Sequence, residues 1–254
     1  MNFRWPWTEP AKTRRARLAL DLEDTLAYAV GDVHGCHAQL LALEDKIEAD
    51  AAFFSGRKLI IMLGDYVDRG PASSSVLDHL LRPPPNGFER ICLAGNHEIA
   101  MLDYCEGRIG LGEWTSLGGD ATLISYGLDP DYLGKAFGSA RKAAEHIRKS
   151  IPEGHIHFLR DLPVLVETPH FVFVHAGIRP GTSLEEQSDD DLTRIRSDFL
   201  HHPHGLRQWV VHGHTPVPTI IPEGRRLNID TGAFYSGCLS AVRIWRKKGH
   251  VIST

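Results

Sequence analysis

Five short blocks of the sequence combine glycine with carboxylate, amide or imidazole side chains. They are 31–35 (GDVHG), 64–70 (GDYVDRG), 95–98 (GNHE), 175–177 (HAG) and 212–215 (HGHT). Each block follows a short apolar run of the kind that forms a buried strand. Where a strand ends, residues two apart point to the same side, so Asp32 and His34 can reach one ion. A single block could be a turn or a helix cap, but the five together predict a metal site.

Six side chains in these blocks are candidate metal ligands: Asp32, His34, Asp65, Asn96, His175 and His214. A mixture of oxygen and imidazole ligands suits a borderline divalent ion better than Ca²⁺. We expect Mn²⁺ first, with Fe²⁺ or Zn²⁺ as alternatives. Two such ions that share a carboxylate can hold a hydroxide between them and stabilise its in-line attack on phosphorus. The ligand set therefore predicts a two-metal phosphoester hydrolase.

The apolar runs and the segments between them predict the elements that position these side chains. Strands are expected at 27–30, 59–63, 90–94, 171–174, 209–211, 227–229 and 239–245, and helices at 37–49, 73–81 and 97–105. Strands that alternate with helices predict an α/β domain with its functional loops at the carboxyl ends of the strands. From about residue 208 the strands follow one another without long helices, which favours antiparallel or mixed pairing.

The rest of the chain divides into an arm, a catalytic domain and an insertion. Residues 1–17 contain Trp5, Trp7 and several basic residues but no apolar stretch of a secretory signal, so we expect an arm that is flexible or docked. Residues 18–254 are predicted to form a single catalytic domain. Within it, the glycine-rich segment 103–162 becomes helical around 131–149 and is expected to be an insertion that covers the site.

The composition is that of an ordinary soluble protein. The formal net charge is −4 and the sequence pI is about 6.4, which does not indicate a nucleic-acid or membrane partner. No run of about 18 apolar residues could span a bilayer. The four cysteines are far apart and form no CxxC pair, so we expect reduced thiols in a cytoplasmic protein.

The order and spacing of GDxHG, GDxVDRG and GNHE resemble the PPP-type branch of the calcineurin-like metallophosphoesterases. The resemblance runs from about Ala27 to Ser240. Trp114, the Gly118-Gly119 pair, 125–127 (SYG) and 229–233 (IDTGA) look like the bacterial and bacteriophage-lambda-type protein serine/threonine phosphatases. This resemblance implies a four-layer αββα fold, in which two mixed β-sheets form a sandwich flanked by helices.

The resemblance also implies a distribution of the metal ligands. Asp65 would bridge two ions. The remaining ligands would be Asp32 and His34 for the first ion, and Asn96, His175 and His214 for the second. Pro216 stands where other metallophosphoesterases have the second histidine of a GHxH motif. The first ion would therefore be completed by water.

The remaining catalytic residues are assigned by the same resemblance. His97 would be the general acid, and Asp68 would orient its imidazole and favour the protonated form. The side chains expected to contact the substrate phosphate are Arg69, Arg196, Asn96 and Tyr235. Guanidinium groups match phosphate oxygens bidentately. Arg194 replaces a family tryptophan near Arg196, so a surface arginine on a helix remains an alternative there. Tyr235 could equally be a packed aromatic at a strand end.

The leading functional hypothesis is a phosphoprotein phosphatase for phosphoserine and phosphothreonine that could extend to phosphotyrosine. The alternative is a symmetrical diadenosine tetraphosphate hydrolase with a dinucleoside polyphosphate substrate. That group more often has alanine at the Asp68 position and GNHD in place of GNHE, which favours the phosphatase. A non-catalytic metal-dependent binding module is disfavoured, because all six ligands, His97, Asp68 and Arg69 are present.

Overall fold

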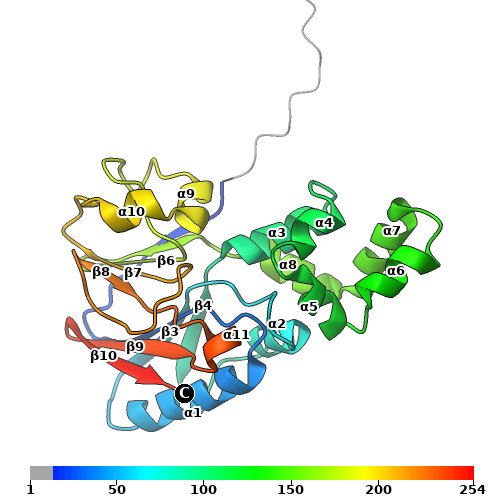
Figure 1. Cartoon of the computed structure of the whole chain (residues 1–254). Helices are drawn as coiled ribbons and strands as arrows, with labels where there is room; N and C mark the ends of the chain where they lie inside the picture. The colour runs from blue at the N-terminus through cyan, green and yellow to red at the C-terminus, as the bar shows by residue number, and fades with distance from the viewer. Residues whose placement is uncertain (1–13) are drawn as a thin grey trace, which may run out of the picture.

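Two five-stranded β-sheets lie one above the other and form a sandwich (Figure 1). The computed structural model describes residues 14–254. The first sheet has the order β1-β5-β6-β7-β8, with β1 Arg17–Ala19, β5 Leu165–Glu167, β6 Phe171–Val174, β7 Trp209–His212 and β8 Arg226–Asn228. The second has the order β10-β9-β2-β3-β4, with β2 Thr25–Val30, β3 Arg57–Met62, β4 Phe88–Cys92, β9 Ser240–Trp245 and β10 Lys248–Ser253.

Both sheets mix parallel and antiparallel pairs. In the second sheet β2, β3 and β4 are parallel, whereas β9 pairs antiparallel with both β2 and β10. In the first sheet β6, β7 and β8 are parallel and β5 runs antiparallel to β6. The parallel strands bring the loops that follow them to one edge of each sheet, which is where ligands bind in such folds.

Strands β2, β6 and β7 are buried along nearly their whole length, which explains their continuous apolar sequences. In β2, Ala27 and Ala29 face the core between the two sheets, where they meet side chains of the first sheet such as Phe173. Leu26 and Tyr28 of the same strand belong to the core beneath the helices. The small alanines let the two sheets approach each other.

Helices cover the outer faces of the sandwich. Helices α1 (His37–Ala51) and α2 (Ser73–Leu81) lie against the second sheet, and α9 (Asp189–Arg194) and α10 (Ser197–His201) lie above the first (Figure 1). The short helix α11 (Ala233–Ser236) follows β8 at the loop edge. This arrangement confirms the expected α/β fold of four αββα layers with mixed sheets.

The segment after β4 forms a separate group of helices beside the sandwich (Figure 1). They are α3 Asn96–Cys105, α4 Leu111–Thr115, α5 Gly119–Ser125, α6 Pro130–Ala136, α7 Ala140–Ser150 and α8 Glu153–Asp161. The segment expected to become helical around 131–149 is helical and consists of two helices. Helix α6 ends at Ala136, and Ser139 begins α7 because its side chain accepts the N–H of Lys142.

Most of the predicted N-terminal arm, residues 1–13, lies outside the described residues. The end of the arm is docked on the body. The guanidinium of Arg15 donates to the carbonyls of Leu159 and Leu162, and β1 begins at Arg17 and pairs with β5. Within residues 14–254, no helix has both the length and the apolar character that a membrane crossing requires.

The buried carboxylate of Glu98, in the first turn of α3, ties together the loops that follow β3 and β4. Its Oε2 atom accepts the N–H groups of Asp65 (2.7 Å) and Gly95 (2.8 Å), and its Oε1 atom accepts the N–H of Tyr66 (2.6 Å). Buried backbone N–H groups require acceptors, and no strand pairing satisfies these. Glu98 therefore sets the position of the 64–67 turn relative to the start of α3.

Replacing Glu98 with alanine should lower the free energy of unfolding by about 3 kcal/mol or more, because each buried donor left without an acceptor costs about 1–3 kcal/mol. Glu98→Gln retains one oxygen acceptor and should lose less. Urea denaturation in the presence of EDTA measures both losses without a metal contribution. The control is Glu89→Ala, which removes an exposed ion pair with Arg57 and should change stability little. A loss in Glu98→Ala as small as in this control would contradict the role of Glu98.

Candidate metal centre

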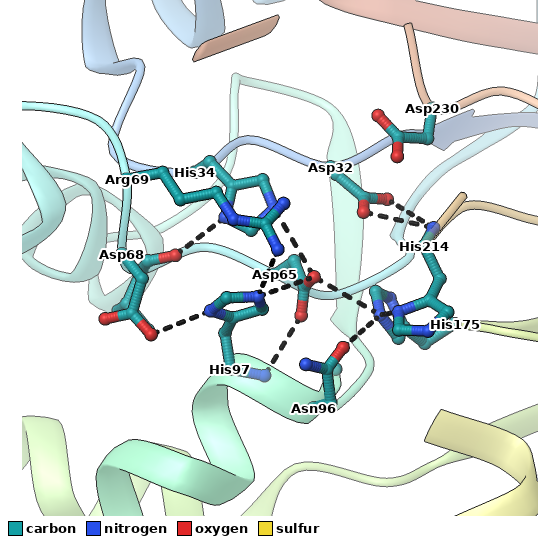
Figure 2. A network of polar contacts seen from close by, with 12 residues as sticks. Asp32, His34, Asp65, Asp68, Arg69, Asn96, His97, His175, His214 and Asp230 are labelled. Atoms are coloured by element: carbon teal, nitrogen blue, oxygen red, sulfur yellow. Dashed lines mark hydrogen bonds and ion pairs between the residues drawn. The ribbon is translucent and has the colours of Figure 1, made fainter. Parts of the chain in front are cut away.

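Side chains from loops after five strands meet at one place on the loop edge of the sandwich (Figure 2). These are the six predicted ligands: Asp32 and His34 after β2, Asp65 after β3, Asn96 after β4, His175 after β6, and His214 after β7. All six are buried, with exposed fractions of at most 6%. The structure therefore brings together residues that are up to 182 positions apart in the chain.

Asp65 lies at the middle of this group. Its Oδ2 atom is 3.4 Å from Nε2 of His34 and 3.4 Å from Nε2 of His175, on either side. Two groups of potential metal ligands share it: His34, Asp65 and His97 form one, and Asp65, His175 and His214 form the other. Burial acts to raise the pKa of Asp65, but His175 and His97 hold it well below the ordinary value. A shared, ionised carboxylate between two groups is the arrangement that a bridging ligand requires.

The imidazoles present nitrogen lone pairs to Asp65. Nδ1 of His34 lies 2.9 Å from the carbonyl oxygen of Val67, and Nδ1 of His175 lies 3.0 Å from that of Leu63. An Nδ1–H that donates to these carbonyls leaves Nε2 as the lone-pair atom. Burial lowers the pKa of His34 to about 3 and that of His214 to about 2. The neutral ring is the form in which histidine binds metals.

Asp32 lies beside the two ligand groups and belongs to neither. Its two oxygens accept the backbone N–H of His214 at 3.3 and 3.1 Å (Figure 2). Asp230, another buried carboxylate, lies next to it. Burial and the charge of Asp230 raise the pKa of Asp32 well above its ordinary value. The sequence predicted no role for Asp230, although its place after β8 matches the position of the other site residues on their strands.

The imidazole of His97 contacts the carboxylate of Asp68, as predicted. Two residues of the 103–162 segment, Trp114 and Thr122, hydrogen-bond to that carboxylate. Nδ1 of His97 lies 2.7 Å from Oδ2 of Asp68. Thr122 donates its hydroxyl to Oδ1 of Asp68 at 2.7 Å, and the Trp114 indole donates to both oxygens at 3.2 and 3.3 Å. Burial acts to lower the pKa of His97, but Asp65 and Asp68 outweigh it and the pKa is raised. Sequence reasoning singled out Trp114 only through the resemblance, and it missed Thr122.

Arg69 enters the centre from the side of His97. Its two terminal nitrogens lie 3.0 Å from Nε2 of His34 and 2.9 Å from Nε2 of His97 (Figure 2). Its guanidinium carbon lies 5.1 Å from the centre of the Phe234 ring. A cation at this point can contact an anion that binds between the two imidazoles.

Arg196 and Tyr235, the two less direct predictions, lie at the periphery of the centre. Arg196 is exposed, and its Nη1 atom lies 3.4 Å from Oγ1 of Thr215, the neighbour of His214. Arg194 instead pairs with Asp190 on the surface at 3.2 Å, so Arg196 is the arginine of this segment that faces the site. Tyr235 is 63% exposed and its ring packs against Phe234.

Five residues of the centre have backbone conformations that only glycine adopts readily. The φ angles are +43° at His34, +53° at Asp65, +70° at Asp68, +67° at Arg69 and +67° at His214. Such residues cost free energy and persist only where surrounding contacts hold them, which is typical of functional sites. The turns expose these side chains at the end of each strand.

The residues fit a pair of divalent cations. Nδ1 of His214 lies 3.1 Å from Nε2 of His175, the nitrogen that faces Asp65. Oδ1 of Asn96 and Nε2 of His175, both lone-pair atoms, lie 3.2 Å apart, as two ligands of one cation do. The carboxylates of Asp32, Asp65 and Asp230 add buried negative charge, which costs free energy unless cations compensate it.

Solved structures with a similar fold cover nearly the whole chain. A crystal structure that is provisionally named a diadenosine tetraphosphatase aligns with a TM-score of 0.62 at 22% identity, over 94% of this chain and 97% of the other. A protein serine/threonine phosphatase from Saccharomyces cerevisiae aligns with a TM-score of 0.55 at 14% identity, over 94% of this chain and 84% of the other. At these identities the likeness concerns the fold alone.

Sequence relatives extend over a similar length. Bis(5'-nucleosyl)-tetraphosphatase PrpE (asymmetrical) from Halalkalibacterium halodurans is 28% identical over 84% of this chain and 88% of its own. The protein of the same name from Bacillus subtilis is 25% identical over 86% of this chain and 91% of its own. The family model described as calcineurin-like phosphoesterase matches residues 27–233, which contain every ligand and both partners of the His97–Asp68 pair. The chain belongs to the calcineurin-like phosphoesterase family.

Proposed function

We propose that this phosphoesterase hydrolyses dinucleoside tetraphosphates asymmetrically, into a nucleoside monophosphate and a nucleoside triphosphate. The observation that carries the proposal is the name shared by relatives that align with at least 84% of the chain. That name supports the dinucleoside polyphosphate substrate of the alternative hypothesis, but it gives the cleavage as asymmetrical rather than symmetrical and names no phosphoprotein. The motifs identify the hydrolytic centre, and the relatives supply the substrate.

In this proposal the six ligands would hold two divalent ions, and Asp65 is the residue that both ligand groups share. Asp32 and His34 would complete one ion, and Asn96, His175 and His214 the other. When bound, the ions would supply Lewis acidity toward a phosphoryl oxygen and a nucleophile at neutral pH. The mixed oxygen and imidazole set suits Mn²⁺, with Fe²⁺ or Zn²⁺ as alternatives.

Two arginines would hold the phosphate chain. Arg69 lies between His34 and His97, and Arg196 lies beside Thr215 near the other ligand group. Their guanidinium groups can take phosphoryl oxygens from two sides and offset part of the charge of the substrate. Asn96 would contact the phosphate as well as a metal, as the family resemblance implies.

His97 would deliver the proton to the leaving group. Asp68 engages Nδ1, so Nε2 is the atom that faces the reacting phosphate. Nε2 contacts Arg69 in the described structure, and this contact must open when substrate draws the guanidinium to its phosphate. The hydrogen bonds from Trp114 and Thr122 fix the Asp68 carboxylate, and therefore the imidazole, in one orientation.

The His97–Asp68 pair also favours a second candidate, a phosphoserine or phosphothreonine phosphatase. Serine and threonine leave as strongly basic alkoxides, which need a proton in the transition state. A nucleoside triphosphate is a far weaker base and can leave with less help. A buried and fully hydrogen-bonded acid is therefore a specific observation in favour of phosphoprotein hydrolysis.

Incubation of the Mn²⁺-loaded protein with diadenosine tetraphosphate should release AMP and ATP in equal amounts. The same protein should turn over a phosphoserine peptide with a lower kcat/KM. Chromatographic separation of the nucleotides measures the products, and the protein after EDTA treatment is the control. ADP as the sole product would contradict asymmetrical cleavage. A higher kcat/KM for the peptide would favour the second candidate.

Replacing His97 with asparagine should slow hydrolysis most for substrates with poor leaving groups. An acid in this position typically contributes about 10²–10⁴-fold in rate. A series of aryl and alkyl phosphates of increasing leaving-group basicity measures the effect, which should be largest for the alkyl esters. The metal content should stay near that of the wild type. Loss of one equivalent of metal in the variant would instead indicate that His97 is a metal ligand and not the proton donor.

Asp65→Asn should lose metal, because a neutral amide between the two ligand groups removes the charge that both ions share. Elemental analysis after dialysis against Mn²⁺ should find two equivalents in the wild type and clearly fewer in the variant. The matched control is Asp120→Asn on the exposed face of α5, which should retain both. Full metal occupancy in Asp65→Asn would remove Asp65 from the bridging position.

A further inference from the structure

Two aromatic side chains are exposed at the rim of the metal centre. Phe234 and Tyr235 lie on α11, directly after the loop that carries Asp230, and are 38% and 63% exposed. Their rings meet edge to face, with centroids 4.9 Å apart. Neighbouring exposed aromatic rings at the rim of a site form an apolar surface that a ligand can cover.

Phe234 joins this pair to residues of the centre. Its ring centroid lies 5.4 Å from that of His34, in an edge-to-face contact, and the guanidinium of Arg69 lies over the ring. A phosphate held by Arg69 would therefore lie next to the aromatic pair. The group that is esterified to this phosphate would therefore lie beside Phe234.

The backbone holds the Tyr235 ring in a defined place. Gly232 and Gly237, both in the left-handed conformation, begin and end the single turn of α11. The Tyr235 ring packs directly over Gly232, where a side chain of any other residue would overlap it. A glycine is required at 232 both for its φ of +65° and for the space that the ring occupies. The Tyr235 ring is therefore held in a fixed position, although most of its surface is exposed to solvent.

We infer that Phe234 and Tyr235 form the subsite for a nucleobase of the substrate; this inference rests on the proposed dinucleoside polyphosphate hydrolysis. Every nucleobase has a flat π-surface that stacks on aromatic side chains, largely irrespective of sequence. A nucleotide places its base one ribose away from its first phosphate. With that phosphate at Arg69, the base reaches the exposed surface of the aromatic pair.

This subsite determines which phosphate is cleaved. A base on α11 puts the phosphate of its own ribose at the metal ligands. Water then adds its oxygen to this phosphorus, and the bond to the oxygen shared with the second phosphate breaks. The products are the nucleoside monophosphate and the nucleoside triphosphate, and the proton goes to the leaving triphosphate. Symmetrical cleavage would instead place the second phosphate there, one unit farther from the base.

The experiment compares two ligands that share a phosphate ester and differ in the base. Binding of AMP and of ribose 5-phosphate to the Mn²⁺-loaded protein is measured by calorimetry for the wild type, Phe234→Ala and Tyr235→Ala. The wild type should prefer AMP. Loss of a stacking residue should reduce that preference by about 5- to 150-fold. Tyr235→Trp should retain it, and Tyr132→Ala, which removes a tyrosine of similar exposure (66%) on α6, should leave it unchanged.

Two results would overturn the subsite. The first is equal affinity of the wild type for AMP and for ribose 5-phosphate. The second is an equal loss of affinity for both ligands in the variants, which would mean that the aromatic pair only supports Arg69. Because binding is measured without turnover, the outcome is separate from that of the proposed function. A base preference that the variants lose, in a protein that does not cleave diadenosine tetraphosphate, would support the subsite and reject the proposed substrate.

Discussion

The position of the Asp65 carboxylate determines the geometry of the whole centre. Its side chain lies between the imidazoles of His34 and His175, and its backbone carbonyl accepts the N–H groups of Val33 and His34. Glu98 accepts the Asp65 N–H. The loops after β2, β3 and β4 are therefore joined at one residue, and a shift of its backbone would move ligands of both groups.

This constraint explains residues that carry no chemistry of their own. A side chain at Gly95 would overlap Oδ1 of Asp65, and one at Gly213 would overlap Oδ1 of Asp32. The two glycines let neighbouring loops approach the carboxylates closely. The positive φ angles of His34 and Asp65 have the same origin, because the chain must turn sharply to present both side chains to one point. Metal binding would repay part of this strain, which couples the occupancy of the site to its stability.

The sequence predicted those parts of the structure that local patterns determine. Apolar runs located seven of the ten strands that residues 14–254 form, and the motifs identified the residues that gather around Asp65. Strands β1 and β5, of three residues each, were missed, and β10 was missed because it begins with Lys248, Gly249 and His250. Trp114 and Thr122 could not be connected to Asp68, since the contacts span 46 and 54 positions and depend on how α4 and α5 pack. The proximity of Asp230 to Asp32 could not be predicted either, because it too depends on how distant parts of the chain pack.

Substrate preference was the part that the motifs could not predict, and the structure indicates why. The six ligands, Asp68 and His97 are buried, and in the proposed function they would surround the phosphorus that reacts, which is the same group in a phosphoprotein and in a dinucleotide. Discrimination must come from side chains that touch the rest of the substrate. Phe234 and Tyr235 lie outside the motifs and are exposed, and Phe234 contacts Arg69 and His34 of the centre. A change at such a rim can redirect one hydrolytic centre to another substrate without altering a single ligand, so the ligands by themselves cannot specify what is hydrolysed.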